Sequence, residues 1–339
     1  MADALLTPAV GGAMAAVSVA AIAYSAAKIK KEDFTNSKVP LMAVSGAMVF
    51  AAQMINFTIP GTGSSGHIGG GILLAALLGP WAGLLALAAV LIIQCLCFAD
   101  GGLLALGCNI FNMGVIPCLF IYPLLFRPIF SRTPSPKRSS AASIVSVIIA
   151  LQLGAFAVVS ETAASGIVQL PFSAFLLLMQ PIHLAIGIVE GIVTAAILVF
   201  VHNARPEILT AAAAYGKTQA AADGKPRSAR KVILVFAVIA AACGIGLSLL
   251  ASSYPDGLEW SIAGVTGAPE LAAQGAAADA LAAIQERFSF MPDYDFAAGD
   301  GTGTSVASIV GAILVFAAAG GAALLIRFAK KSKRAKAQS

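Results

Sequence analysis

The residues best able to do chemistry lie in one stretch, 56–71, which reads Asn-Phe-Thr-Ile-Pro-Gly-Thr-Gly-Ser-Ser-Gly-His-Ile-Gly-Gly-Gly. Glycine fills six of these sixteen positions, so the backbone can turn sharply and approach a ligand closely. His67, one of three histidines in the chain, supplies an imidazole, which is a common ligand of late transition metals. The stretch predicts a metal-binding loop. The alternative is a turn at a membrane surface whose histidine bonds a backbone carbonyl.

A second pair of ionisable residues, His183 and Glu190, lies inside a long apolar run. Seven residues apart, they share one face of a helix, about 10.5 Å apart along its axis. Ionisable groups within a membrane are costly and usually face a bundle interior or a polar cavity. Two interpretations stay open: a relay, secondary site or conformational lock, and a satisfied hydrogen-bond network. The separation is too large for both side chains to hold one ion directly.

Other polar side chains interrupt the apolar segments near these positions. We expect Gln53 and Asn56 to lie one turn apart on the helix that leads into the His67 loop, where they could orient a ligand through hydrogen bonds. Ser65 and Asn109 are candidates for the same role, and hydrogen bonding between helices is the alternative for all four residues. Two further acidic residues at predicted segment ends, Asp100 and Glu161, are expected to be solvated or capping carboxylates.

Enzyme chemistry is not supported by these residues. Ser64 and Ser65 near His67 could suggest a nucleophile and its base, but no third orienting group is visible in the sequence. The GxxxxGK[ST] phosphate-binding pattern is absent from the sequence, so we do not expect this chain to bind and hydrolyse ATP in that way. The prediction is a transport or binding protein, with any ATP hydrolysis carried out by separate subunits.

The elements that position these groups are membrane helices. The chain has 339 residues, of which 59% are hydrophobic and 11% charged, and its mean hydropathy is +0.89. Because soluble domains contain about 25% charged residues, this composition predicts a polytopic membrane protein. Abundant Ala and Gly favour closely packed helices. All five cysteines lie in apolar runs, so we expect buried free thiols.

Hydropathy and charge together predict the topology. A spanning helix needs about 20 apolar residues, and candidate spans cover 8–27, 39–58, 68–79, 82–98, 103–126, 141–163, 176–201, 232–252 and 306–328. Basic residues cluster after the first and fifth spans, before the eighth and at the C-terminus, and the positive-inside rule assigns these clusters to the cytoplasm. The chain must therefore cross the membrane an even number of times between the basic clusters after the first and fifth spans. This requires the short third span to count as a crossing, and Gly79–Pro80 separates it from the fourth span.

The fold class is therefore all-α: a polytopic bundle of seven transmembrane helices, followed by a two-helix C-terminal module. We expect a metal-binding membrane domain at 1–203, a cytoplasmic basic linker at 204–231, and a module at 232–339 with an acidic extracytoplasmic loop. The N-terminus is predicted to lie outside and the C-terminus in the cytoplasm of a multi-pass plasma-membrane protein. No nucleic-acid partner is expected, because the excess positive charge lies in membrane-flanking clusters.

Five segments occur in order through residues 1–203: ADALLTPAVGG (2–12), VPLM (39–42), QMINF (53–57), ADGGLLALGCN (99–109) and HLAIGIVE (183–190). Together with the His67 loop, they resemble the CbiM/NikM family, the cobalt- or nickel-specific substrate-binding (S) components of energy-coupling factor (ECF) ABC transporters. The segment SYPDGLEW (253–260) resembles the PDGLE domain, which is similar to the auxiliary NikN/CbiN-like subunit of the same importers.

The resemblance implies a square-planar, all-nitrogen metal site. Its donors would be the N-terminal amine of Met1, the backbone nitrogen and imidazole of a histidine at position two, and the imidazole of His67. Such donors suit Ni²⁺ or Co²⁺. This chain departs at position two, which is Ala2. Either a genuine Met-His pair precedes Met1, or this member uses only the amine and His67.

The resemblance also implies the function and the partners. The chain would capture Ni²⁺ or Co²⁺ as transported substrate and deliver it inward with ATP-binding subunits and a coupling transmembrane subunit, for cobalamin synthesis or a nickel enzyme. The alternative is a secondary transporter or channel driven by an ion gradient, with His183 and Glu190 as coupling groups. A vitamin-specific S component would need a larger apolar-aromatic pocket lining.

Overall fold

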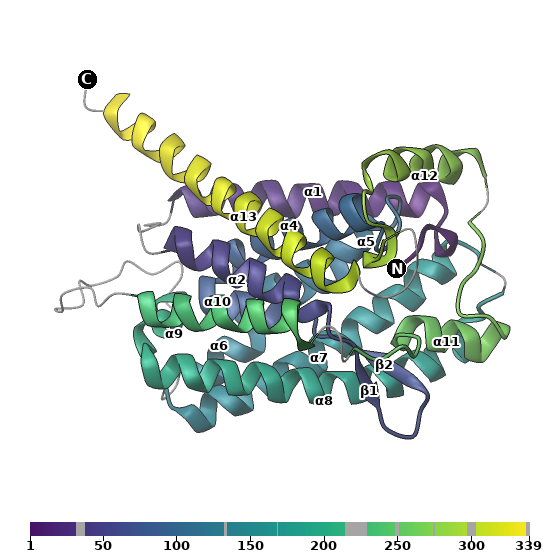
Figure 1. The fold of residues 1–339 in the computed structure, drawn as a ribbon, viewed down its shortest axis with the longest axis horizontal. Helices are drawn as coiled ribbons and strands as arrows, with labels where there is room; N and C mark the ends of the chain where they lie inside the picture. The colour runs from purple at the N-terminus through teal and green to yellow at the C-terminus, as the bar shows by residue number, and fades with distance from the viewer. Residues whose placement is uncertain are drawn as a thin grey trace.

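The protein is a bundle of long helices, described by a computed structural model over residues 1–31, 38–131, 134–167, 169–213, 229–247, 251–273, 275–296 and 303–336 (Figure 1). The first part of the chain forms η1 (Asp3–Leu5), α1 (Pro8–Lys31), α2 (Lys38–Gln53), β1 (Phe57–Ile59), β2 (Ser64–Gly66), α3 (Gly71–Leu78) and α4 (Pro80–Phe98). The middle part forms α5 (Leu106–Ile110), η2 (Phe111–Phe126), α6 (Arg127–Ser131), α7 (Pro136–Ala164), α8 (Phe172–Ala204) and α9 (Pro206–Ala213). The last part forms α10 (Arg230–Ile245), α11 (Gly257–Thr266), α12 (Ala276–Phe288), η4 (Pro292–Tyr294) and α13 (Gly303–Lys336).

Each predicted span coincides with a helix, which confirms the all-α membrane-bundle class. Among the described residues, six helical segments are long and apolar enough to cross a membrane: Pro8–Ile29, Pro80–Phe98, Leu106–Ser131, Pro136–Ala164, Phe172–Ala204 and Gly303–Phe328. The other three are shorter, since α2 and α10 have 16 residues each and α3 has eight. The segment from α5 to α6 stays helical through Pro117 and Pro123 by adopting a wider π-helical path over η2, which accommodates residues that cannot donate a backbone hydrogen bond.

The helix α3 occupies the centre of the bundle. All eight of its residues are buried, and it packs against α4, η2, α9, α7, α8 and α2. It ends at Gly79, whose φ of +89° is open to glycine but strained for other residues, and Pro80 begins α4. The predicted break between the third and fourth spans is confirmed at these two residues.

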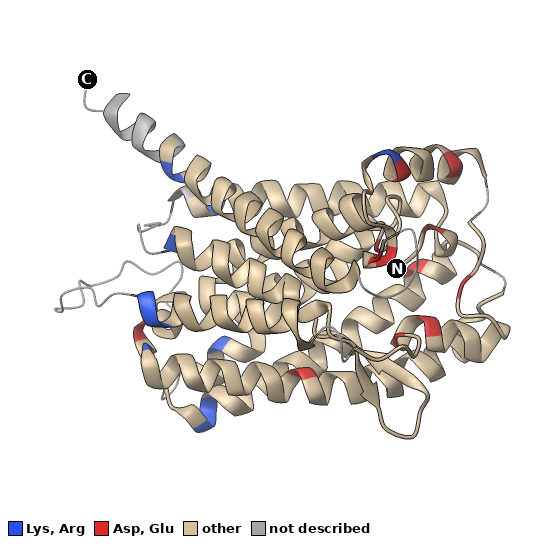
Figure 2. Cartoon of the chain, in the orientation of Figure 1, with Lys and Arg blue, Asp and Glu red and all other residues tan. Residues whose placement is uncertain are grey.

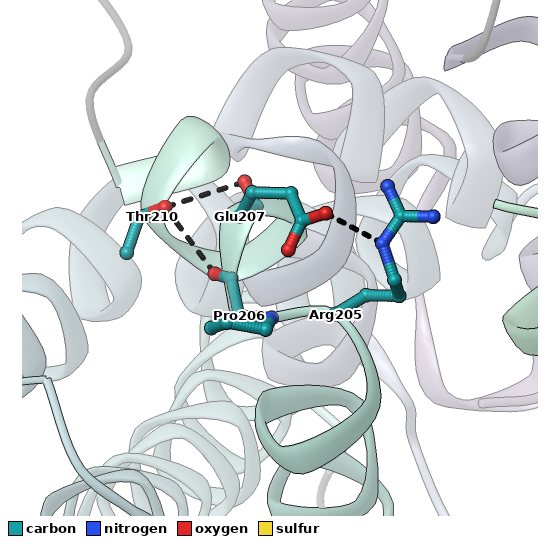
Figure 3. A network of polar contacts seen from close by, with 4 residues as sticks. All are labelled: Arg205, Pro206, Glu207 and Thr210. Carbon is teal, nitrogen blue, oxygen red and sulfur yellow. Dashed lines mark hydrogen bonds and ion pairs between the residues drawn. The ribbon is translucent and has the colours of Figure 1, made fainter. Parts of the chain in front are cut away.

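The charges separate along the bundle (Figure 2). Among the described residues, Lys and Arg gather where α8 ends and α10 begins, which we call the basic end. Asp and Glu gather mainly at the opposite end, around the N-terminus, α11 and α12, which we call the acidic end. An acidic residue at the basic end, Glu207, accepts a 2.5 Å hydrogen bond from Arg205 Nε in the turn between α8 and α9 (Figure 3).

The C-terminal module lies against the N-terminal bundle. Helices α10 and α13 both pack along α2, and α13 also contacts α4 (Figure 1). Between α10 and α13, the predicted acidic loop contains α11, α12 and η4. The predicted basic linker contributes α9, while residues 214–228 fall outside the described part of the chain. All five cysteines are free thiols, four of them buried and Cys97 half-buried.

Candidate metal centre

The His67 loop is a small hairpin. Strands β1 and β2 pair antiparallel, with Phe57 opposite Gly66 and Ile59 opposite Ser64. Helix α2 already ends at Gln53, so the prediction that Asn56 lies on that helix, one turn beyond Gln53, is wrong. Asn56 lies in the connection between α2 and β1, where its carbonyl accepts a 2.7 Å hydrogen bond from the amide of Ser252, in the C-terminal module.

The loop is packed into the bundle. Ser64, Ser65 and Ile68 are buried, and His67 is half-buried. Gly66 lies directly on α8: a Cβ at this position would come within 2.6 Å of Ile186 Cγ1. Only glycine allows this approach, so the side chain of Ile186 fixes the loop immediately before His67.

The loop is also held just after His67, at Gly69 and Gly70. The amide of Gly69 donates to Glu190 Oε2 and the amide of Gly70 donates to Glu190 Oε1, each at 2.9 Å. The carbonyl of Gly69 accepts from Gln53 Nε2 at 2.9 Å. Gln53 Oε1 in turn accepts from Gln94 Nε2 at 2.9 Å. Gln53 therefore bonds to the backbone of the loop and not to the imidazole of His67.

The first residues of the chain lie against the α4–α5 connection. The Met1 carbonyl accepts hydrogen bonds from the amide of Gly102 at 3.2 Å and from Asn109 Nδ2 at 3.3 Å. Asp3 Oδ1 accepts from the amide of Ala105 at 2.9 Å. Burial raises the pKa of the Asp3 carboxyl, while hydrogen bonds from backbone amides and the nearby amino terminus partly offset the increase.

Met1 and His67 line the same cavity, which has a volume of about 160 Å³. Its wall also includes Asn109, His183 and Glu190. The Nδ1 atom of His67 lies 3.2 Å from the carbonyl oxygen of Ile68. A carbonyl oxygen only accepts hydrogen bonds, so Nδ1 carries the hydrogen of the neutral imidazole. The lone pair of Nε2 is then available to bind a metal. The fold thus brings together two groups separated by 65 residues of sequence.

His183 and Glu190 of α8 both have hydrogen-bond partners. His183 Nδ1 lies 2.8 Å from the Met179 carbonyl oxygen, one turn earlier on the same helix. Both carboxylate oxygens of Glu190 accept from the loop. Of the two interpretations open for this pair, the structure supports the satisfied hydrogen-bond network. It also places both side chains on the cavity wall.

The C-terminal module supplies another part of the cavity wall, through Asp256, Gly257 and Leu258. Asp256 caps α11: its Oδ1 accepts from the amides of Leu258 and Glu259, and Glu259 Oε2 accepts from the amide of Asp256. This reciprocal pattern is a capping box. The Asp-x-x-Glu spacing was visible in the sequence, but its place beside the cavity was not.

Ser65 bonds to this same segment rather than to His67. Its hydroxyl donates to the Tyr254 carbonyl at 2.8 Å, and its amide donates to the Pro255 carbonyl at 2.8 Å. Trp260 Nε1 donates to the Thr62 carbonyl at 2.9 Å. Ser65 therefore joins the His67 loop to the C-terminal module.

Two further acidic residues have different environments. The prediction of a solvated or capping Glu161 is wrong, since this residue is buried and Glu161 Oε2 accepts from Asn112 Nδ2 at 2.9 Å. Asp100 is exposed, as expected, and accepts a hydrogen bond from the hydroxyl of Tyr294. Burial and the Asp100 carboxylate raise the pKa of the Tyr294 phenol well above its ordinary value, so the phenol remains a proton donor at neutral pH.

The cavity wall carries both nitrogen and oxygen ligand atoms. Within the described residues, no three side chains of His, Cys, Asp or Glu come together as a metal-binding cluster. The wall includes two half-buried imidazoles, from His67 and His183, and the first residue of the chain. Ala2 is exposed and its methyl group offers no donor atom.

Comparison with known proteins identifies the family. Residues 1–208 match the family described as the cobalt uptake substrate-specific transmembrane region, CbiM. The chain belongs to the CbiM family. Residues 230–328 match the PDGLE domain. The resemblance predicted from the sequence is therefore confirmed for both parts of the chain, and the protein is a multi-pass membrane protein of a metal transport family.

Individual relatives agree with this assignment. An Archaeoglobus fulgidus protein named as a fused nickel transport protein, NikMN, is 37% identical over 217 residues, covering 63% of this chain and 69% of the relative. A Haloquadratum walsbyi protein named as a metal transport protein is 34% identical over 209 residues, covering 61% of this chain and 91% of the relative. A crystal structure titled as a truncated transition metal transporter is 29% identical, with a TM-score of 0.53, and the match covers 60% of this chain and 98% of that one.

Proposed function

We propose that this chain is the substrate-binding membrane subunit of an ECF-type importer, capturing Ni²⁺ or Co²⁺ outside the cell. A coupling transmembrane subunit and ATP-binding subunits would drive delivery to the cytoplasm. The observation that carries the proposal is the shared cavity of Met1 and His67. An amine and an imidazole are both nitrogen donors, which suit a late transition metal.

In this proposal the metal is held by nitrogen. The Met1 amine, the backbone nitrogen of Ala2 and the imidazole of His67 would be the donors. Nitrogen donors in a planar arrangement favour Ni²⁺, and also suit Co²⁺, over Mg²⁺ or Ca²⁺, which require oxygen ligands. In the alternative, a Met-His pair precedes Met1, and its amine and imidazole take the places of the Met1 amine and the Ala2 nitrogen.

The charge distribution supports an orientation with the acidic end outside. Basic residues of the described chain gather at the opposite end of the bundle (Figure 2), and loops rich in Lys and Arg stay in the cytoplasm. The cavity would then receive its cation from outside. The proposed secondary-transporter alternative receives less support, because both oxygens of Glu190 already accept hydrogen bonds from the loop.

The proposal is tested by metal titration of the purified full chain in detergent. We expect His67→Ala to weaken Ni²⁺ and Co²⁺ binding at least about 100-fold, since a first ligand is lost. His202→Ala removes a half-buried imidazole that contacts Phe130 on α6, at the far end of α8 from the cavity, and should bind as the wild type does. Stoichiometric Ni²⁺ retained by His67→Ala, with wild-type affinity, would refute the site.

The energy source is tested separately in cells. Ni²⁺ uptake should disappear when the genes for the ATP-binding subunits are deleted, because the sequence of this chain lacks the phosphate-binding pattern. Uptake that persists in the deletion strain and collapses with the proton gradient would instead favour the secondary transporter.

A further inference from the structure

We infer that Glu190 is a positioning residue: it fixes the His67 imidazole for metal binding by holding the backbone that follows it, without contacting the metal. The inference rests on the proposed function, since it assigns a support to the same site. It follows from where α8 meets the loop on either side of His67.

Helix α8 contacts the loop immediately before His67. Gly66 lies so close to Ile186 that a Cβ would come within 2.6 Å of Cγ1. One turn further along α8, Glu190 accepts hydrogen bonds from Gly69 and Gly70, each at 2.9 Å. Residues four apart on a helix lie on the same face, so one face of α8 holds the backbone both before and after His67. The backbone that carries the imidazole therefore cannot be displaced without disturbing one of these contacts.

The turn after His67 is also held from the opposite direction. Gln53, at the end of α2, donates to the carbonyl of Gly69, and Gln94 of α4 donates to Gln53. Gly70 adopts a left-handed conformation with φ of +77°, and a Cβ there would lie 2.5 Å from Val49 Cγ1 on α2. Two helices, α2 and α8, thus bond to a single two-residue turn, and α4 supports it indirectly through Gln53.

A carboxylate is well suited to this role. Glu190 is only 2% exposed, and an isolated charge in such a place is strongly unfavourable unless hydrogen bonds compensate for it. Hydrogen bonds to a charged acceptor are about twice as strong as neutral ones. A carboxylate can accept from both amides at once, whereas a glutamine in the same place presents one oxygen and one NH₂ group. Glu190→Gln therefore leaves one amide facing another donor.

The experiment measures the Ni²⁺ dissociation constant, the ligand-field absorption of the bound ion and the apo unfolding temperature of the full chain in detergent. We expect Glu190→Gln to weaken Ni²⁺ binding about tenfold or more, as expected for the loss of one or two charge-assisted hydrogen bonds. The absorption band at saturating Ni²⁺ should keep its position, because the ligands are unchanged. Glu286→Gln, the same change at an exposed position of α12, serves as the matched control and should bind normally.

Glu190→Asp separates positioning from a general effect of negative charge. Aspartate keeps the charge but is one methylene too short to reach both amides, so positioning predicts weaker binding here too. Wild-type affinity in Glu190→Asp would overturn the inference in favour of charge alone. A displaced absorption band in Glu190→Gln would overturn it in favour of direct ligation.

Gln53→Leu provides a test that leaves Glu190 in place, in case Glu190→Gln does not fold. It removes the donor to the Gly69 carbonyl and should weaken binding severalfold, again without moving the band. If His67→Ala abolishes binding while neither Glu190→Gln nor Gln53→Leu changes it, the inference is wrong and the proposed function stands. If His67→Ala binds normally, the proposed function itself fails.

Discussion

The two walls of the cavity that carry Met1 and His67 are built very differently. The His67 loop is bonded by side chains from α2 and α8, with α4 supporting α2, and by the backbone of the C-terminal module. The N-terminal segment, residues 1–6, has a single turn of 3₁₀ helix, and its hydrogen bonds come from the connection between α4 and α5 and from Asn109 of α5. One wall is bonded by side chains of the long helices, while the other is a chain end anchored mainly by the buried side chains of Leu5 and Leu6.

This difference suggests a division of roles at the cavity. A ligand fixed before the metal arrives loses little conformational entropy on binding, whereas a chain end loses more. The imidazole would therefore define the position of the cation, and the amino terminus would close on it. The following predictions address this contrast, starting with the largest effect.

Blocking the amino terminus should have the largest effect. Extending the chain with Met-Gly-Ser ahead of residue 1 moves the free amine away from the cavity, so we expect Ni²⁺ affinity to fall by about 100-fold or more, as for loss of any first ligand. Titration of the extended protein checks this, with the same three residues added after Ser339 as control. Unchanged affinity in the N-terminally extended form would show that the chain end takes no part.

A gain is expected when the missing donor is restored. In a chain that begins at Met1, Ala2→His adds an imidazole at an exposed position beside the cavity wall. One further nitrogen ligand should tighten Ni²⁺ binding at least about tenfold, or about 1.4 kcal/mol. Ala2→Ser is the control. Equal affinity of Ala2→His and the wild type would indicate that the N-terminal segment cannot bring position two to the metal.

The smallest effect concerns the pH dependence of the N-terminal wall. Burial raises the pKa of Asp3 in the folded protein, so its contribution to stability is present below the unfolded pKa and is lost as the pH rises through the folded value. Asp3→Asn keeps an oxygen that can accept from the Ala105 amide but does not titrate. The difference in unfolding temperature, Asp3→Asn minus wild type, should therefore be larger at pH 7 than at pH 4.5. Thermal unfolding in detergent at both pH values measures it, and a difference that shrinks towards pH 7 would contradict the assignment.

Much of the fold follows from local sequence signals. Apolar runs of about 20 residues predict spans without knowledge of their neighbours, and Gly79–Pro80 marks a helix break by its own chemistry. The charge clusters showed that the short segment containing α3 should be counted as a separate helix. These features depend on residues close together in the chain, so the sequence was sufficient for them.

The site was only partly predictable, because its contacts are distant in sequence. His67 was visible from its type and its glycine neighbours, but Gln94 and the segment around Asp256 gave no sign that they lie near it. Asn56 was placed on a helix by hydropathy, which does not register the hydrogen bond that its carbonyl accepts from Ser252, 196 residues away. Glu161 resembled a helix-end carboxylate because its partner, Asn112, is 49 residues away.

The buried helix α3 has a consequence for how ions could cross this protein. It begins at the cavity, where Gly71 and Ile72 form part of the wall. It ends beside α9, because a Cβ built on Gly79 would lie 3.8 Å from the carbonyl oxygen of Ala212. Leucine, isoleucine and alanine side chains fill this route. A hydrated divalent ion has no favourable environment along such a path. Translocation would therefore require α3 and its neighbours to change their packing, a gating step slower than diffusion through an open pore.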